Sequence, residues 1–270
     1  MHTPNPHRGS SRALRPLALL AIALLAAAFL ARQAEAQTGP PPDIDFTGTW
    51  LGIGDDPDVP YRNSAFPYPP PFTAKGRELS QYWQDPRNNL GARCLPGGGP
   101  AGQMNAGVFF PIEFIQRPEQ MTILFEAMQQ VRRVFLDGRD HPSPDDLETS
   151  WMGHSIGRWE GDTLVVDTIG TKAGTLNGSG ASVIPRAGDR DARMPYTETL
   201  HLVERMRLLD RGQILEVEQT IDDPVVYTAP YTLKRYWKRS PETPIIEYIC
   251  TENLRPEDEG YEHLREAMPN

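Results

Sequence analysis

The segment Gly153-His154-Ser155-Ile156-Gly157 places a histidine and a hydroxyl between two glycines, as in the nucleophile elbow of a serine hydrolase. Such an elbow needs a helix directly after its serine. Here the chain passes through Glu160-Gly161-Asp162, which is typical of a tight turn, into the alternating stretch 163–168. We therefore predict strand, turn, strand over residues 151–168. A serine hydrolase acting through Ser155 is only the third hypothesis for the function.

His154 is the first candidate for a catalytic general base, because an imidazole changes its charge near neutral pH. Alternate residues of a strand share a face, so His154 shares one with Ile156, Arg158 and Glu160. We expect this face to line an enclosed cavity, where a polar group among apolar neighbours has a function. A core histidine bonded to the backbone is the alternative.

Acidic, phenolic and guanidinium groups from other predicted strands could complete a proton-transfer site. Glu198 or Glu126 would orient the imidazole or share its proton, and Tyr196 would be a proton donor. Arg132 or Arg133 would hold a developing anion. The alternatives are a structural ion-pair cluster, a solvated histidine and tryptophans that only fill the core. The candidates for substrate binding are Arg132, Arg133, His201, Trp151 and Trp159.

A metal site has weak support from residue spacing. After residue 36 no two histidines lie two, three or four residues apart. A site of two histidines and a carboxylate assembled from different strands stays open as an alternative, but we predict no metal and no cofactor. The histidines concerned are His141, His154, His201 and His263.

The first 36 residues have the pattern of a secretory signal peptide. Arginines precede an apolar run over 17–30, and Ala34-Glu35-Ala36 resembles a cleavage site. The run is shorter than the ~20 residues that a membrane-spanning helix needs. We therefore predict cleavage before Gln37, a periplasmic or secreted location and no stable membrane insertion.

Charge and cysteine content restrict the partners and the compartment. The formal net charge of −9 disfavours nucleic acid, whose phosphates attract clustered lysine and arginine, so the expected partner is a small molecule. The oligomeric state is not indicated. Cys94 and Cys250 are the only cysteines, and an exported chain favours a disulfide between them over a catalytic thiol.

The sequence pattern predicts a mainly β fold. Residues 55–107, rich in proline and glycine, should wrap the domain and include one helix near 73–83 that Thr73 caps. Tight turns between strands predict an antiparallel meander closed into a lipocalin-like barrel, with one or two short helices in all. The strands are expected at 111–117, 121–127, 130–136, 153–160, 163–169, 197–209, 213–222, 229–238 and 244–251, after a short one near Trp50.

The chain is expected to form one domain. Residues 46–254 would be the barrel, after a disordered leader over 37–45 and before a charged tail over 255–270. The Gly-rich segment 172–194 is too long for an ordinary connection and is predicted to be a lid that closes over the site.

Two resemblances support these predictions. Gly48-Thr49-Trp50 resembles the G-x-W start of lipocalin-like (calycin) barrels, which implies that fold. From Pro71 to Asn253 the chain resembles a large set of exported bacterial proteins of unassigned activity. That resemblance rests on "PIEFIQRPEQMTILFE", "VRRVFLDGRDHP", "WMGHSIGRWEGDTLVVDT", "ETLHLVER" and "TIDDPVVYTAPYTLKR". Many of its members have Pro-His-Ser-Glu where this chain has Pro195-Tyr196-Thr197-Glu198, so chemistry that needs that histidine is in doubt here.

The leading hypothesis is an exported enzyme that moves protons without a cofactor. It would be an isomerase or lyase acting on a partly apolar molecule such as an aromatic, terpenoid or sugar derivative. The alternative is a periplasmic carrier barrel, in which the same residues give binding without chemistry.

Overall fold

The computed structural model describes residues 44–54, 56, 58–67, 69–105, 110–176 and 193–253. The predicted signal peptide, nearly all of the predicted leader and the charged tail lie outside the described residues. Residues 177–192, most of the predicted lid, also lie outside them.

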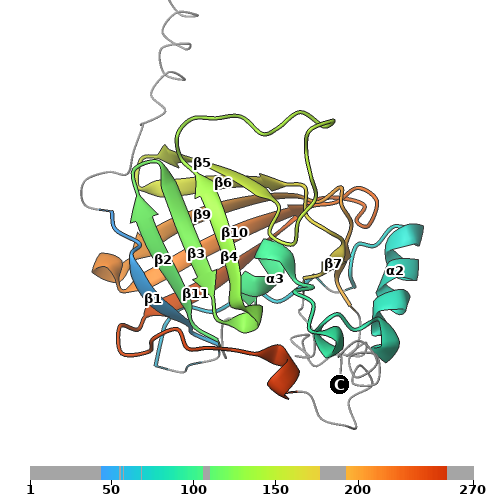
Figure 1. The fold of residues 1–270 in the computed structure, drawn as a ribbon, viewed down its shortest axis with the longest axis horizontal. Helices are drawn as coiled ribbons and strands as arrows, with labels where there is room; N and C mark the ends of the chain where they lie inside the picture. The colour runs from blue at the N-terminus through green and yellow to red at the C-terminus, as the bar shows by residue number, and fades with distance from the viewer. Residues whose placement is uncertain are drawn as a thin grey trace, which may run out of the picture. The chain divides into compact units, whose positions relative to one another are not determined.

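Nine strands of the described part close into a barrel in the order β1-β11-β10-β9-β6-β5-β4-β3-β2 (Figure 1). The prediction of a mainly β closed barrel is therefore confirmed. A separate pair, β7 with β8, lies between β6 and β9 in the chain. The strands are β1 (Gly48–Gly52), β2 (Ile112–Arg117), β3 (Gln120–Phe125), β4 (Gln130–Phe135), β5 (His154–Glu160), β6 (Thr163–Ile169), β7 (Gly174–Thr175), β8 (Pro195–Tyr196), β9 (His201–Leu209), β10 (Ile214–Asp222) and β11 (Tyr231–Arg239).

One neighbouring pair of barrel strands departs from the predicted meander. β4 and β5 are parallel and are paired at Val134 with Ser155 and at Phe135 with Ile156. A parallel pair needs a connection that returns to the starting end of the first strand. Loop 136–153 makes this return outside the barrel, and Figure 1 shows it passing beyond β5. This path places the loop over the outer face of the wall.

The two α-helices of the described part have different roles. α2 (Ala74–Gln84) follows the predicted boundaries, and the Thr73 hydroxyl accepts a hydrogen bond from the Gly76 amide at 3.0 Å. α3 (Gly99–Asn105) was not predicted, because glycine and proline disfavour a helix interior. All seven of its residues are buried, and tertiary packing therefore outweighs their weak helix propensity. Short 3₁₀ turns span Pro86–Asn88, Gly91–Arg93, Ala127–Gln129, Asp210–Gly212 and Cys250–Asn253.

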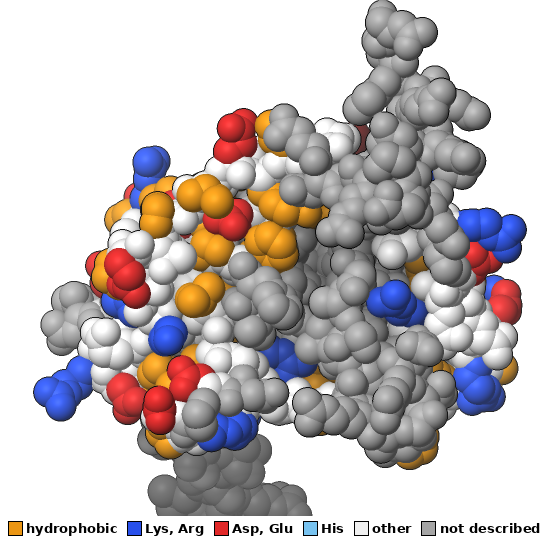
Figure 2. Space-filling model, turned by 90° about the horizontal axis from the view of Figure 1, so that it is seen from below, with side chains coloured by type: hydrophobic (Ala, Val, Ile, Leu, Met, Phe, Trp, Pro, Cys, Tyr) orange, Lys and Arg blue, Asp and Glu red, His pale blue; other side chains and the backbone are white. Residues whose placement is uncertain are grey.

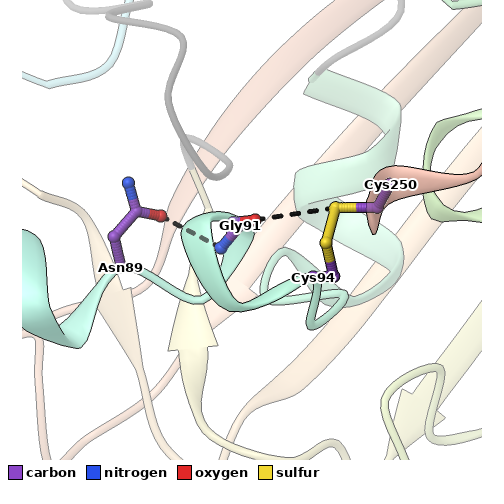
Figure 3. Close-up of a disulfide and its surroundings, with 4 residues drawn as sticks. All are labelled: Asn89, Gly91, Cys94 and Cys250. Carbon is purple, nitrogen blue, oxygen red and sulfur yellow. Dashed lines mark hydrogen bonds between the residues drawn. A yellow bond between two sulfur atoms is a disulfide. The ribbon is translucent and has the colours of Figure 1, made fainter. Parts of the chain in front are cut away.

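The prediction of a strand over 244–251 is wrong. Residues 244–249 have no regular secondary structure, and the Ile246 amide donates to the Glu126 carboxylate at 3.0 Å. Cys250 forms the predicted disulfide with Cys94, beside the turn that contains Gly91 (Figure 3). These two anchors fix the segment without strand pairing.

The predicted strand over 197–209 begins later than expected, at His201. The buried Asp223 carboxylate accepts hydrogen bonds from the Thr197 amide at 2.6 Å and from the Thr199 hydroxyl at 3.0 Å. These bonds hold residues 197–200 as a turn, and carboxylate bonding of this kind competes with strand pairing.

Large side chains fill the barrel interior. Trp50, Phe114 and Trp237 are at most 1% exposed and belong to one core cluster, to which Met104 of α3 also contributes. On the face shown in Figure 2, acidic and basic side chains are interspersed, and neither sign forms a single continuous patch. No helix of the described residues is long and apolar enough to cross a membrane.

Candidate active site

Three histidines and one aspartate form a continuous hydrogen-bonded chain on the outer wall of the barrel. His154 Nδ1 lies 2.8 Å from His141 Nδ1, and His141 Nε2 lies 3.2 Å from Asp167 Oδ1. His201 Nε2 lies 3.0 Å from both Asp167 oxygens. We call His141, His154, Asp167 and His201 the histidine cluster.

Three strands and one loop position the histidine cluster. His154 begins β5 and His201 begins β9, while Asp167 lies on β6 between these two strands. Asp167 pairs with Ile156 on one side and with Val203 on the other. His141 comes from loop 136–153, which the parallel crossover carries over this face. The cluster therefore depends on the closed sheet and on the crossover together.

The hydrogen bonds of the cluster select the proton positions on its rings. An ionised carboxylate only accepts, so His141 and His201 both donate to Asp167 through Nε2–H. When His141 is neutral, its Nδ1 lone pair accepts a hydrogen bond from His154 Nδ1–H. This tautomer of His154 has its basic lone pair on Nε2, which has no hydrogen-bond partner among the described residues. Asp167 thus selects the tautomer of His154 through His141, without contacting the His154 ring.

The pKa of His154 is lowered below its usual 6.5. Burial is the largest cause, because it disfavours the charged ring; repulsion from His141 in its protonated form and from the Arg139 guanidinium act in the same direction. The ring is therefore neutral at pH 7, the state that a general base requires.

An aromatic ring and a guanidinium lie near His154. The Phe135 ring stacks on it with centroids 5.3 Å apart, and the Arg139 guanidinium lies 3.9 Å from the Phe135 centroid. Arg139 is also paired with Asp137 at 2.5 Å. Arg133 precedes the register pair Val134 with Ser155, so its exposed side chain projects from the outer face next to His154. The site thus has a base, an aromatic surface and two nearby cations.

The expectation that His154 faces an enclosed cavity is wrong. The alternation was predicted correctly, but Ser155, Gly157 and Trp159 face the interior and His154 faces outward. Packing explains this choice, because Trp159 is 2% exposed and contacts the Phe46 ring, with centroids 5.8 Å apart. Burying that indole removes more apolar surface from water than burying Ile156 would.

Ser155 and Arg132 lie on the other side of the wall from His154. Ser155 is completely buried, β5 continues past it as a strand, and its hydroxyl accepts from Arg132 Nε at 3.1 Å. A serine without access to solvent and without a following helix cannot act as a nucleophile elbow. Arg132 is 1% exposed and pairs with Glu204, so it cannot hold a substrate anion beside His154.

The predicted acid and phenol partners of His154 do not reach it. Glu198 is exposed in the turn before β9, and Glu126 binds the Ile246 amide. Tyr196 is buried against α3, donates to the Gly97 carbonyl at 3.3 Å and has a pKa raised by burial. Among the described residues no hydrogen bond or ion pair joins these three to the histidine cluster. Their roles in catalysis are therefore not supported by the geometry.

The remaining substrate-binding candidates divide into two groups. His201 belongs to the cluster, and its side chain is 45% exposed. Trp151 is half-buried and lies 5.4 Å from the Lys172 ammonium, while Trp159 is a core residue.

The predicted proton-transfer site included neither His141 nor Asp167; His141 entered only the metal alternative, and Asp167 only the serine hydrolase alternative, as a possible acid of its triad. Asp167 had a signal, because it interrupts the apolar stretch Leu164–Val166 on an otherwise buried strand. His141 had none, since it lies in a loop rich in proline and aspartate whose path depends on the crossover. No protein-family model matches this chain, and no curated protein matches it either. Function is therefore inferred from the site itself.

Proposed function

We propose that the protein is an exported enzyme that transfers protons, an isomerase or lyase, and that the histidine cluster is its active site. The observation that carries the proposal is the chain His154–His141–Asp167, which leaves a neutral imidazole with an available Nε2 lone pair. The same tautomer control by a carboxylate, through one imidazole rather than two, operates in other acid–base enzymes. No cofactor is needed for this chemistry.

The reaction starts with transfer of a substrate C–H proton to His154 Nε2. The electrons of that bond remain on the substrate as an enolate or a related anion, and in this proposal the exposed Arg133 of the neighbouring strand β4 stabilises it. Asp167, through His141, stabilises the imidazolium that forms. Return of the proton to another carbon gives an isomer, and loss of a leaving group gives an elimination product. His201 joins the same carboxylate to solvent and can exchange its proton with water.

The surroundings of the base favour a partly apolar, anion-forming substrate. The Phe135 ring, which stacks on His154 and lies under the Arg139 guanidinium, adds apolar surface beside the base. Arg133 and Arg139 supply positive charge, and Asp137 partly neutralises Arg139. A carrier is less well supported, because its usual binding cavity would be the barrel interior, which core side chains fill.

A metabolite pool incubated with the purified protein in D₂O tests this proposal. Proton transfer predicts a product that contains deuterium and is otherwise isobaric with its substrate for an isomerase, or lighter by the leaving group for a lyase. His154→Ala and Asp167→Asn should each reduce its formation by about a hundredfold or more. Glu218→Gln, an outward-facing change on β10, is the matched control and should keep full activity.

Three outcomes would contradict the proposal. A product that has gained water would indicate a hydrolase, and retention of activity in His154→Ala would remove the base. Binding of a pool component without turnover would indicate the carrier.

A further inference from the structure

We propose that Arg132 is a positioning residue for the histidine cluster, acting from inside the barrel on the strands that carry the cluster outside. The effect of Arg132 on turnover rests on the proposed function. Its effect on the placement of the histidine cluster does not depend on any reaction. Arg132 touches neither a substrate site nor the cluster itself.

Arg132 is the centre of a buried polar network that joins four strands to its own. From β4, its Nε donates to Ser155 of β5 at 3.1 Å, and its Nη2 donates to Thr168 of β6 at 2.9 Å. Nη2 also pairs with Glu204 of β9 at 2.5 Å. Gln219 of β10 donates to the second Glu204 oxygen at 3.1 Å. All of these side chains are at most 1% exposed.

Two of the four cluster residues, His154 and Asp167, have a direct chain neighbour in this network. His154 precedes Ser155 and Asp167 precedes Thr168, and Ser155 and Thr168 are register partners whose hydroxyl oxygens lie 2.9 Å apart. Side chains alternate between the two faces of the wall. The Arg132 guanidinium therefore binds β5 and β6 on their inner face, next to the positions from which His154 and Asp167 project outward. His201 lies three residues before Glu204 on β9.

The seam that most needs such support lies between β4 and β5. These parallel strands pair only at Val134 with Ser155 and at Phe135 with Ile156. Arg132 bridges this seam next to His154, where the backbone ladder ends. A displacement of about 1 Å in a catalytic group costs roughly a hundredfold in rate, so a fixed seam has a functional value.

Stability gives a poor account of this network. Buried ion pairs are often no more stabilising than apolar side chains of the same volume. Arg132 also has one nitrogen, Nη1, without a hydrogen-bond partner among the described residues, and such an unmet donor is costly. We therefore explain this network by its effect on the geometry of the histidine cluster and not by its contribution to stability.

The test compares Arg132→Met/Glu204→Gln with Arg235→Met. The double variant removes both charges and leaves an amide oxygen at position 204 that can still accept from Gln219. Arg235 is a matched control, because it is 6% exposed, binds Asn105 and the Ser64 carbonyl, and lies on β11. Imidazole ¹⁵N NMR against pH reports the tautomer and titration midpoint of His141, His154 and His201 without any substrate.

We expect the double variant to fold and to change the His154 and His141 midpoints by about half a pH unit or more, with mixed tautomers. Arg235→Met should leave the titration midpoints and the tautomers of His154 and His141 unchanged. Turnover should fall by roughly tenfold to a hundredfold in kcat, with a shifted pH profile and a similar KM. Thr168→Val removes two network bonds, to Arg132 and to Ser155, and no charge, and it should give a smaller shift in the same direction.

Unchanged imidazole signals in a folded double variant would overturn the proposal, even if its melting temperature fell. If that variant does not fold, Thr168→Val decides by the same measurement. Altered imidazoles without turnover in the wild-type protein would support the positioning role while removing the proposed function, so the two failures are distinguishable.

Discussion

At the scale of single residues, chemistry in this protein depends on which ring nitrogen carries a proton. Asp167 accepts from His141 and His201, and His141 passes this constraint to His154. A carboxylate thus controls the basicity of a ring with which it has no direct contact. Burial, the protonated form of His141 and the Arg139 guanidinium all lower the His154 pKa and favour the neutral ring.

The lowered pKa predicts a pH dependence of activity. Because the base must be neutral, kcat/KM should be constant above the His154 pKa and should fall tenfold per pH unit below it, with a midpoint under 6.5. Arg139→Gln removes a positive charge that faces the ring, so the midpoint should move upward by a fraction of a unit. A midpoint above 7 in the wild-type protein, or a downward move in the variant, would contradict this assignment.

At the scale of elements, the crossover between β4 and β5 decides where the site forms. A hairpin at this position would leave loop 136–153 at one end of the barrel, and His141 would not lie on the outer wall. Gly153, the last residue of this loop, has a φ of +64° and directly precedes His154. An added Cβ there would meet the Ile169 carbonyl oxygen at 2.6 Å.

Gly153→Ala should therefore displace the start of β5 and reduce both stability and activity. Positive φ alone costs about 1–2 kcal/mol for a residue with a Cβ, and the contact with β6 adds to it. Gly138→Ala is the matched control in the same loop, because its φ is +79° and nothing lies within 4 Å of the added atom. Urea unfolding and kcat measured on both variants check this, and equal losses would show that crowding at Gly153 has no effect.

At the scale of the whole molecule, one disulfide joins the chain after the last strand to the segment before α3. Cys94 and Cys250 are 156 residues apart in the sequence, and their Cα atoms lie 5.6 Å apart. Such a bond restricts the unfolded chain strongly, because it closes a loop of most of the barrel. It also supports the Glu126–Ile246 anchor of the same segment.

Replacing both cysteines by serine should lower the free energy of unfolding by about 2–5 kcal/mol. The wild-type protein under reducing conditions should lose the same free energy of unfolding. Chemical unfolding with and without reductant measures this loss. Because the histidine cluster lies on β5, β6, β9 and loop 136–153, turnover by the folded double variant should be nearly unchanged. A loss of activity larger than the loss of folded protein would show that the disulfide supports the site.

Local patterns in the sequence were sufficient for much of the fold. Apolar alternation and turn residues predicted β2 to β6 and β10 to β11 within a few positions, and Thr73 marked the start of α2. The pair Cys94–Cys250 followed from there being only two cysteines. Local patterns failed for α3, where burial overrides propensity, and for 244–251, which is anchored by side-chain and disulfide bonds.

The sequence by itself determined which residues share a strand face, because side-chain alternation is a property of the backbone. Only the tertiary structure decided which face is inside, since that depends on how Trp159 and its neighbours pack in the closed barrel. The histidine cluster is a tertiary property for the same reason. His141 meets His154 and Asp167 through a parallel crossover, and the pairing of distant strands is not encoded in any local pattern of residues.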